Sequence, residues 1–166
     1  IDKLDWGVKN GTLFVRLKPN AGNSGANAEV KLAYSPFAKL KVSGANVAVK
    51  DTVKCLMLDV DISAGGTLGL NMDATDLLLK VTGNSVANIG GNVKYYTLNA
   101  SSRSKVDSRS LQCTDANVSA SAGAEVYVRA NERMQLSADT GASLFYAGEP
   151  VILRTSTKTM GVINFI

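Results

Sequence analysis

The sequence predicts an all-β fold in which short strands stack into a parallel β-helix. The first observation is a repeat, because the segment KLKVSGANVAV (39–49) recurs in altered form along the rest of the chain. The second is the pattern within each copy, where apolar and polar residues alternate on both sides of a small, turn-prone tripeptide, as in strands with one buried face. The third is the lack of a convincing amphipathic helical stripe anywhere in the chain.

The later copies of the repeat are nearly evenly spaced. Aligning Val47, Leu68, Val86, Val106, Val126, Leu144 and Met160 gives steps of 21, 18, 20, 20, 18 and 16 residues. A unit of this length cannot bury an apolar face alone, so neighbouring units must stack as in a solenoid. A leucine-rich repeat would need a denser leucine and asparagine pattern, which is missing here.

Stacking predicts columns of equivalent side chains that point into one interior. The first column is Leu40, Val60, Leu79, Leu98, Val118, Leu136 and Leu153. The second is Val42, Ile62, Val81, Ala100, Ala120, Ala138 and Thr155. Nearly every member is apolar, as a shared core requires. The glycine and serine residues of the tripeptide, such as Ser43-Gly44-Ala45, suit the corners between strands.

Length and composition are those of one domain covering residues 1–166, with 45% hydrophobic and 19% charged residues. The net charge of +4 is modest and the 18 basic residues are scattered, which does not favour a nucleic-acid partner.

No apolar run is long enough to cross a bilayer. We therefore expect membrane attachment only through a lipid anchor outside this chain. The chain begins at Ile1 without Met, which is compatible with removal of an N-terminal leader.

Residues 1–35 lack the repeat, and their pattern predicts strands that cap the N-terminal end of the solenoid. Apolar residues alternate on both sides of Asn10-Gly11, a strong β-hairpin signal. A Gly/Asn loop is expected over 19–27 and a further strand over 30–34. We expect this segment to cover the open end of the solenoid, whose strand edges could otherwise pair with other chains.

The repeats occupy residues 36–166, joined by short connections at 50–54, 71–76 and 90–94. The apolar residues near the C-terminus, among them Phe165 and Ile166, either cover the last turn of the solenoid or contact another molecule, including a second copy of the chain.

The two cysteines are expected to be free and buried. Cys55 lies 13 residues before Leu68 and Cys113 lies 13 before Val126, so both occupy one column three turns apart. That separation is too large for a disulfide. With only two cysteines and no histidine in the chain, we expect no zinc site, and no cofactor is indicated.

One candidate for enzymatic chemistry is the pair Asp59 and Asp61, two residues apart on one strand face. The predicted register places Asp59 beside Lys39, and Asp61 between Lys41 and Lys80. We interpret these residues as a solvent-exposed ladder of opposite charges. Glu125 beside Lys105 has the same interpretation. A nucleophilic triad lacks its commonest base, because the chain has no histidine.

A candidate binding surface lies on the second strand of the later repeats. Tyr127 and Phe145 fall in an outward column beside Asp107, and Arg109 and Arg129 are expected to stack two positions further on. Exposed aromatics beside arginines suit a sugar ring or an anionic chain. In the alternative interpretation, a register slip of one residue turns the aromatics inward.

Three segments carry a resemblance to a known family. The V-S-G-A element (42–45) follows an alternating strand, N-G-T-L-F-V (10–15) lies upstream, and P-F-A-K-L (36–40) leads into the first repeat. With these segments the chain resembles, over essentially its whole length, the putative auto-transporter adhesin head domain of Bacteroidetes-type bacteria. The resemblance implies a right-handed β-helix, export to the cell envelope, often with a lipid anchor, and an adhesive role. It supplies no catalytic residues.

The sequence therefore favours a non-enzymatic binding module of the bacterial cell envelope, whether periplasmic, anchored to the outer membrane or extracellular. The expected partner is a surface carbohydrate or another envelope protein. The alternative is a carbohydrate-active lyase or hydrolase that uses Asp59 and Asp61. A third possibility is a structural module that self-assembles through its apolar C-terminal end.

Overall fold

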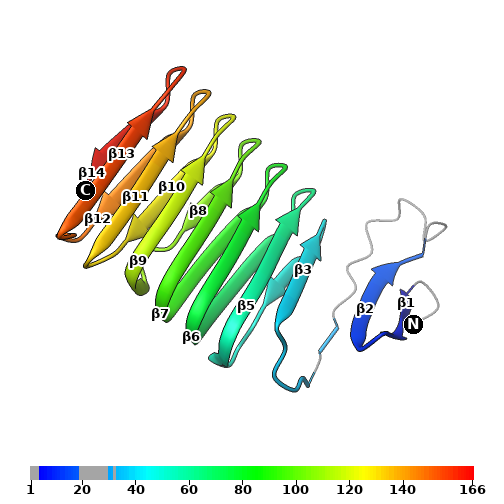
Figure 1. The fold of residues 1–166 in the computed structure, drawn as a ribbon. Helices are drawn as coiled ribbons and strands as arrows, with labels where there is room; N and C mark the ends of the chain where they lie inside the picture. Colours follow the sequence, from blue (N-terminus) through cyan, green and yellow to red (C-terminus); the bar gives the residue numbers. More distant parts are fainter. Residues whose placement is uncertain (1–3, 19–29, 32) are drawn as a thin grey trace. The chain divides into compact units, whose positions relative to one another are not determined.

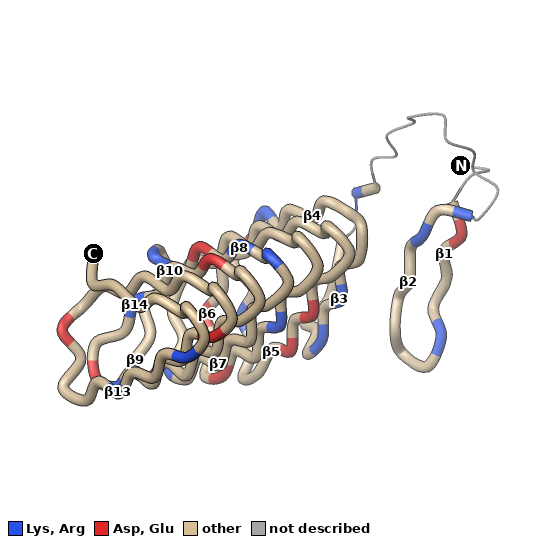
Figure 2. Tube along the Cα trace, turned by 90° about the horizontal axis from the view of Figure 1, so that it is seen from above, with Lys and Arg blue, Asp and Glu red and all other residues tan. Residues whose placement is uncertain are grey.

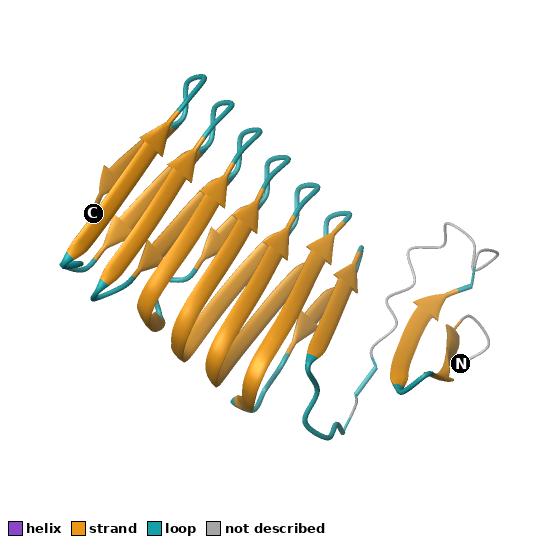
Figure 3. Ribbon diagram, viewed as in Figure 1, coloured by secondary structure: helices purple, strands orange, loops and turns teal. Residues whose placement is uncertain are grey.

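In a computed structural model, which describes residues 4–18, 30–31 and 33–166, the chain divides into two compact units between Ala33 and Tyr34. The described residues form strands, turns and irregular segments without any helix (Figure 3). The larger unit is a parallel β-solenoid of about seven turns, and the smaller contains an antiparallel hairpin (Figure 1). The predicted all-β fold class is thus confirmed.

The hairpin consists of β1 (Leu4–Lys9) and β2 (Thr12–Leu17). Trp6 lies opposite Val15 in the antiparallel register. The turn residues Asn10 and Gly11 both have positive φ, of 51° and 73°, as a two-residue type I′ turn requires. This hairpin was predicted from the same residues.

The chain between the hairpin and the solenoid differs from expectation where it is described. The strand predicted over 30–34 is wrong, because residues 30, 31, 33 and 34 form no strand. Alternating apolar residues show which side chains could share a face, but a strand also needs a neighbour that accepts its hydrogen bonds. The loop predicted over 19–27 lies outside the described residues.

Each turn of the solenoid contributes to two sheets. The first sheet contains β3 (Lys39–Ser43), β5 (Val53–Ser63), the second halves of β6 (Thr67–Val81) and β7 (Val86–Ala100), and then β9 (Leu111–Ala120), β11 (Arg133–Ala138) and β13 (Ile152–Thr157). The second sheet contains β4 (Asn46–Ala48), the first halves of β6 and β7, and then β8 (Lys105–Asp107), β10 (Glu125–Arg129), β12 (Ser143–Ala147) and β14 (Val162–Phe165). The long strands β6 and β7 bend from one sheet into the other. The connections predicted at 71–76 and 90–94 therefore lie inside continuous strands.

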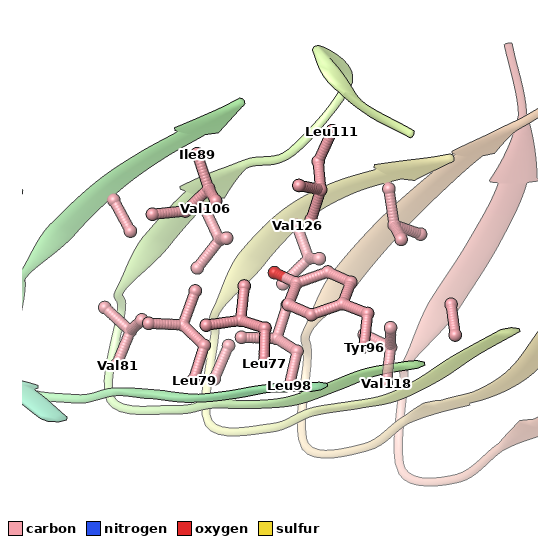
Figure 4. Packing of buried hydrophobic residues seen from close by; sticks show 14 of the residues in the cluster. Leu77, Leu79, Val81, Ile89, Tyr96, Leu98, Val106, Leu111, Val118 and Val126 are labelled. Atoms are coloured by element: carbon pink, nitrogen blue, oxygen red, sulfur yellow. The ribbon is translucent and has the colours of Figure 1, made fainter. Parts of the chain in front are cut away.

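The predicted stacking is observed for most of the solenoid. Leu79 pairs with Val60 on one side and Leu98 on the other, and the first column continues through Val118 to Leu136. These side chains are almost completely buried and pack against the facing column of the second sheet (Figure 4). The sequence-based register is therefore correct from the first turn to the sixth in the first sheet.

Four positions in the predicted columns are wrong. In the second sheet Ala87, and not Val86, pairs with Leu68, so the column was displaced by one residue. In the last turn Leu136 pairs with Thr155 and Ala138 with Thr157, so both columns of the first sheet were displaced by two residues. Leu144 pairs with Ile163, a displacement of three residues. The prediction favoured apolar residues as members of each column. In the structure, backbone hydrogen bonding keeps paired residues of the first sheet 18 to 20 positions apart in the sequence.

The corners between the sheets share one backbone conformation in spite of their different sequences. Paired residues of positive φ recur at Ala64-Gly65, Gly83-Asn84, Ser102-Arg103, Ala122-Gly123, Thr140-Gly141 and Thr159-Met160. At five of these corners a backbone N–H donates to the carbonyl three residues earlier, as in the 3.0 Å bond from Gly66 N to Ser63 O. At Gly83-Asn84 the Ser85 hydroxyl donates to Thr82 O at 2.6 Å. Successive corners also bond to one another, as in the 2.8 Å bond from Gly65 N to Gly83 O. This stacking holds even Arg103 in a conformation that normally favours glycine.

The cysteine prediction is confirmed in register and corrected in burial. Cys55 pairs with Ala74, Ala74 with Val93, and Val93 with Cys113, so the two thiols share a column three turns apart and are free. Cys113 is buried and donates to the Arg129 carbonyl at 2.8 Å, whereas Cys55 is only half-buried. Cys55 lies near the start of the solenoid, where fewer turns cover it.

Candidate functional site

The outward side of the second sheet carries the predicted binding residues. Asn88, Asp107, Tyr127, Phe145 and Asn164 pair successively across five turns. Their strand neighbours Val126 and Leu144 are completely buried. Because alternate residues of a strand face opposite sides, Tyr127 and Phe145 point outward, and the slip that would bury them has not occurred.

The two aromatic rings stack along the solenoid axis. The ring centroids of Tyr127 and Phe145 are 4.8 Å apart and the planes differ by 15°. The Arg109 guanidinium lies 4.8 Å from the Tyr127 centroid. Since Arg109 is held by Asp107 on the turn before Tyr127, and Phe145 lies on the turn after it, both faces of the Tyr127 ring are covered. Asn164 lies beside Phe145 on the following turn, so the outward edges of the two half-buried rings remain for a ligand.

Arg109 and Asp107 form a charge-paired unit. The Arg109 backbone N and side-chain Nε donate to Asp107 Oδ1 at 3.1 Å and 3.0 Å, and Nη2 donates to Oδ2. Hydrogen bonding to Arg109 lowers the pKa of the Asp107 carboxyl below its usual value, and the same interaction raises the pKa of Arg109. Both groups stay ionised at neutral pH, so the pair as a whole carries no net charge.

The predicted stack of Arg109 on Arg129 is wrong. Strand β8 ends at Asp107, and the next residues turn, with Leu111 N donating to Ser108 O at 3.1 Å. Arg109 therefore lies in the turn and folds back on Asp107. Arg129 continues its strand and pairs with Ala147. The turn avoids two like charges on adjacent strands, which would repel each other.

A shallow hollow of about 410 Å³ adjoins Asp107 on the same face. We call it the Gly69 hollow. It is lined by Ala48, Val49, Gly69, Leu70, Asn71, Asn88, Ile89, Gly90, Asp107 and Ser110. Sequence reasoning missed this feature. The available signal was Gly69, a single glycine inside an otherwise alternating strand.

The charge ladder on the first sheet is observed as predicted. Lys39 pairs with Asp59, and Asp61 lies between Lys41 and Lys80. Lys39 Nζ is 2.6 Å from Asp59 Oδ2, and this hydrogen bond raises the pKa of Lys39. On the second sheet Lys105 Nζ lies 3.6 Å from Glu125 Oε2. Figure 2 shows acidic and basic residues interspersed along the solenoid.

No group of three or more potential metal-ligating side chains occurs within the part of the chain that the structure describes. Over those same residues, no helix is long and apolar enough to span a membrane.

The architecture defines the class of protein as a parallel β-solenoid with a half-buried aromatic stack and polar groups on the outer side of one sheet. A family profile for the putative auto-transporter adhesin head GIN domain matches residues 1–150, and the chain belongs to this family. The resemblance drawn from the sequence is thus confirmed, and the chain is an adhesin-like surface module.

A solved structure supports the same fold. The chain is similar to the crystal structure of a putative adhesin from Bacteroides fragilis NCTC 9343, with 18% sequence identity and a TM-score of 0.84. The similarity covers 99% of this chain and 77% of the other. A search of curated proteins matched none.

Proposed function

We propose that the chain is a non-enzymatic module of the bacterial cell envelope that holds a surface carbohydrate on the outer side of the second sheet. The observation that carries this proposal is the outward stack of Tyr127 and Phe145 beside Arg109 and Asp107. Aromatic rings pack against the apolar face of a sugar, while neighbouring polar groups bond its hydroxyls. Arg129, which is exposed on the same sheet, supplies further donors at the edge.

A carbohydrate suits this surface better than an anionic chain would. The charge of Arg109 is already balanced by Asp107, so little free positive charge remains at the centre of the surface. Protein interfaces concentrate aromatic and apolar residues in a dry centre, whereas this surface mixes two rings with amides and a charge pair. Another envelope protein remains the competing partner, and export to the envelope is part of the proposal.

Binding of the wild type to an array of oligosaccharides, followed by titration calorimetry, tests the proposal. Phe145→Ala should weaken binding at least tenfold, because it removes one of the two rings of the aromatic stack. Tyr95→Ala is the matched control, since Tyr95 is an exposed aromatic elsewhere on the molecule with Lys94 5.2 Å from its ring centroid. Equal effects of the two variants, or no binding to any oligosaccharide, would contradict the proposal.

The competing enzymatic function rests on Asp59 and Asp61. Turnover of a uronide-containing polysaccharide that disappears in Asp61→Asn would establish it. The two carboxylates alternate with Lys39, Lys41 and Lys80 on neighbouring strands. This arrangement favours a charge ladder instead, because each carboxylate has a basic residue beside it in the sheet. Saturable binding without turnover is the expected result.

A further inference from the structure

Gly69 lies where the fold has no need for a glycine. It is in the interior of β6, pairs in regular register with Ala48 and Asn88, and is absent from the residues of positive φ. A Cβ built at Gly69 meets no other atom within 4 Å. A larger side chain would fit and would also strengthen the strand, since glycine weakens strand interiors.

The neighbouring glycines show how different Gly69 is. A Cβ at Gly91 would lie 1.9 Å from the Met72 carbonyl oxygen, and one at Gly90 would lie 2.4 Å from Asn71 Oδ1. Close backbone packing explains Gly91, whereas the contact at Gly90 is with the end of the flexible Asn71 side chain. At Gly69 no bulge, positive φ or close contact explains the missing side chain. Another common reason for glycine in a strand is the close approach of a ligand or another chain.

The Gly69 hollow has the size and chemistry of a small binding site. Its volume of about 410 Å³ falls within the ordinary range for ligand pockets. The carboxamides of Asn71 and Asn88 can both donate and accept, the Ser110 hydroxyl can do either, and the Asp107 carboxylate accepts. Gly69 and Ala48 also line the hollow and add no polar side chain to it.

We infer that the Gly69 hollow is a subsite for one neutral sugar unit, an inference that rests on the proposed function. Sugar hydroxyls match a lining of amides, a hydroxyl and a carboxylate. An acidic sugar would bring a second negative charge beside Asp107. The charge of Arg109 already balances that of Asp107, so it would not balance a second one. The hollow and the aromatic stack share the register Asn88, Asp107, Tyr127 and Phe145. A chain of sugars along the solenoid axis therefore passes from Gly69 to Phe145.

Filling the hollow separates ligand binding from folding. In Gly69→Val the new side chain occupies open space and favours a strand, so the melting temperature should stay unchanged or rise by about 1–4 °C. Affinity for the strongest neutral oligosaccharide on the array should fall at least tenfold. The matched control is Ser137→Val, which adds a valine on the outer side of the first sheet, away from the hollow, and should change affinity less than twofold.

The outcomes distinguish this inference from the function on which it rests. Loss of binding in Phe145→Ala but not in Gly69→Val would overturn the subsite and leave carbohydrate binding in place. Failure of the wild type to bind any oligosaccharide would overturn both. Tighter binding of polygalacturonate than of neutral dextran, mannan or galactan would overturn the neutral class. Should Gly69→Val lose its far-UV circular dichroism spectrum, Gly69→Ser fills part of the same space and must still weaken binding.

Discussion

The N-terminal hairpin and the solenoid solve the problem of burying apolar side chains in different ways. In the solenoid every turn places apolar residues of two sheets against each other, and the turns above and below complete the enclosure. In the hairpin most apolar residues of both strands share one side, while Phe14 lies on the other; those that share a side are Leu4, Trp6, Val8, Leu13, Val15 and Leu17. Two strands have no second layer of their own. A repeat builds its own core, whereas an isolated hairpin needs a surface from elsewhere.

This difference underlies our proposal that residues 1–35 cap the solenoid. The first turn contains Phe37, Leu40 and Val47, which are only partly buried against the core. An apolar hairpin face and an incompletely covered apolar end are complementary in chemistry. The experiments below test the contrast between the self-sufficient core and the dependent hairpin, starting with the largest expected effect.

Shortening a side chain within the column should be the most damaging change. Leu98 is 1% exposed and lies between Leu79 and Val118, so Leu98→Ala should lower the free energy of unfolding by about 2–5 kcal/mol. Leu78→Ala, at an outward position 39% exposed, should cost less than about 1 kcal/mol. Urea unfolding followed by circular dichroism measures both. Similar losses would show that the interior does not carry the stability.

Thiol reactivity reports how completely the interior excludes water. Burial raises the pKa of the Cys113 thiol to about 12. Burial also raises the pKa of the Cys55 thiol, which is only half-buried. Because the thiolate is the reactive form and Cys113 is the more deeply buried thiol, Cys113 should react with a disulfide reagent at pH 8 at least about tenfold more slowly than Cys55. The variants Cys55→Ser and Cys113→Ser each leave one thiol for measurement. Comparable rates would mean that the middle of the solenoid opens as readily as its start.

The single tryptophan tests the cap directly, because Trp6 lies on the apolar side of the hairpin. If the hairpin covers the first turn, Trp6 fluorescence should be shifted to the blue and should change together with circular dichroism during unfolding. Trp6→Ser should then cost about 1–3 kcal/mol, as for other buried apolar residues. Trp6 fluorescence that resembles free tryptophan before unfolding begins would refute the cap.

The smallest effect is expected at the charge pair of the binding surface. Arg109 lowers the pKa of Asp107, so the pair stabilises the fold above the unfolded pKa, about 3.9, and this contribution disappears as the pH falls through the lower folded value. The Asp107 side chain is 36% exposed, so Asp107→Asn should cost less than about 1 kcal/mol at pH 7. Thermal unfolding between pH 2 and 7 should show the difference between the two proteins disappearing at the acid end. A constant difference would exclude the charge pair as its cause.

Much of the fold was predictable because its signals are local and repeated. The hairpin followed from Asn10-Gly11, and the column through Leu79 and Leu98 followed from spacing alone. The errors occurred where one turn departs from its neighbours. Val86 was chosen over Ala87 because it is more apolar, although the inward position beside Leu68 accepts the smaller residue.

The candidate site was less predictable than the fold. The outward column of Asp107, Tyr127 and Phe145 followed from the period of two. The reversal of Arg109 did not, because it depends on a turn that ends β8 after three residues. The Gly69 hollow was missed, since no local pattern tells a glycine required by its backbone from one beside open space.

The sequence by itself determined that strands stack, which side chains point inward, and that small or flexible residues prevail at most corners, because these properties recur in every turn and depend on near neighbours. Only the tertiary structure decided that the faces of Tyr127 are covered, that Arg109 neutralises Asp107, and that space lies open above Gly69. Those features depend on side chains from different turns meeting at definite distances, and a one-dimensional pattern contains no distances between turns.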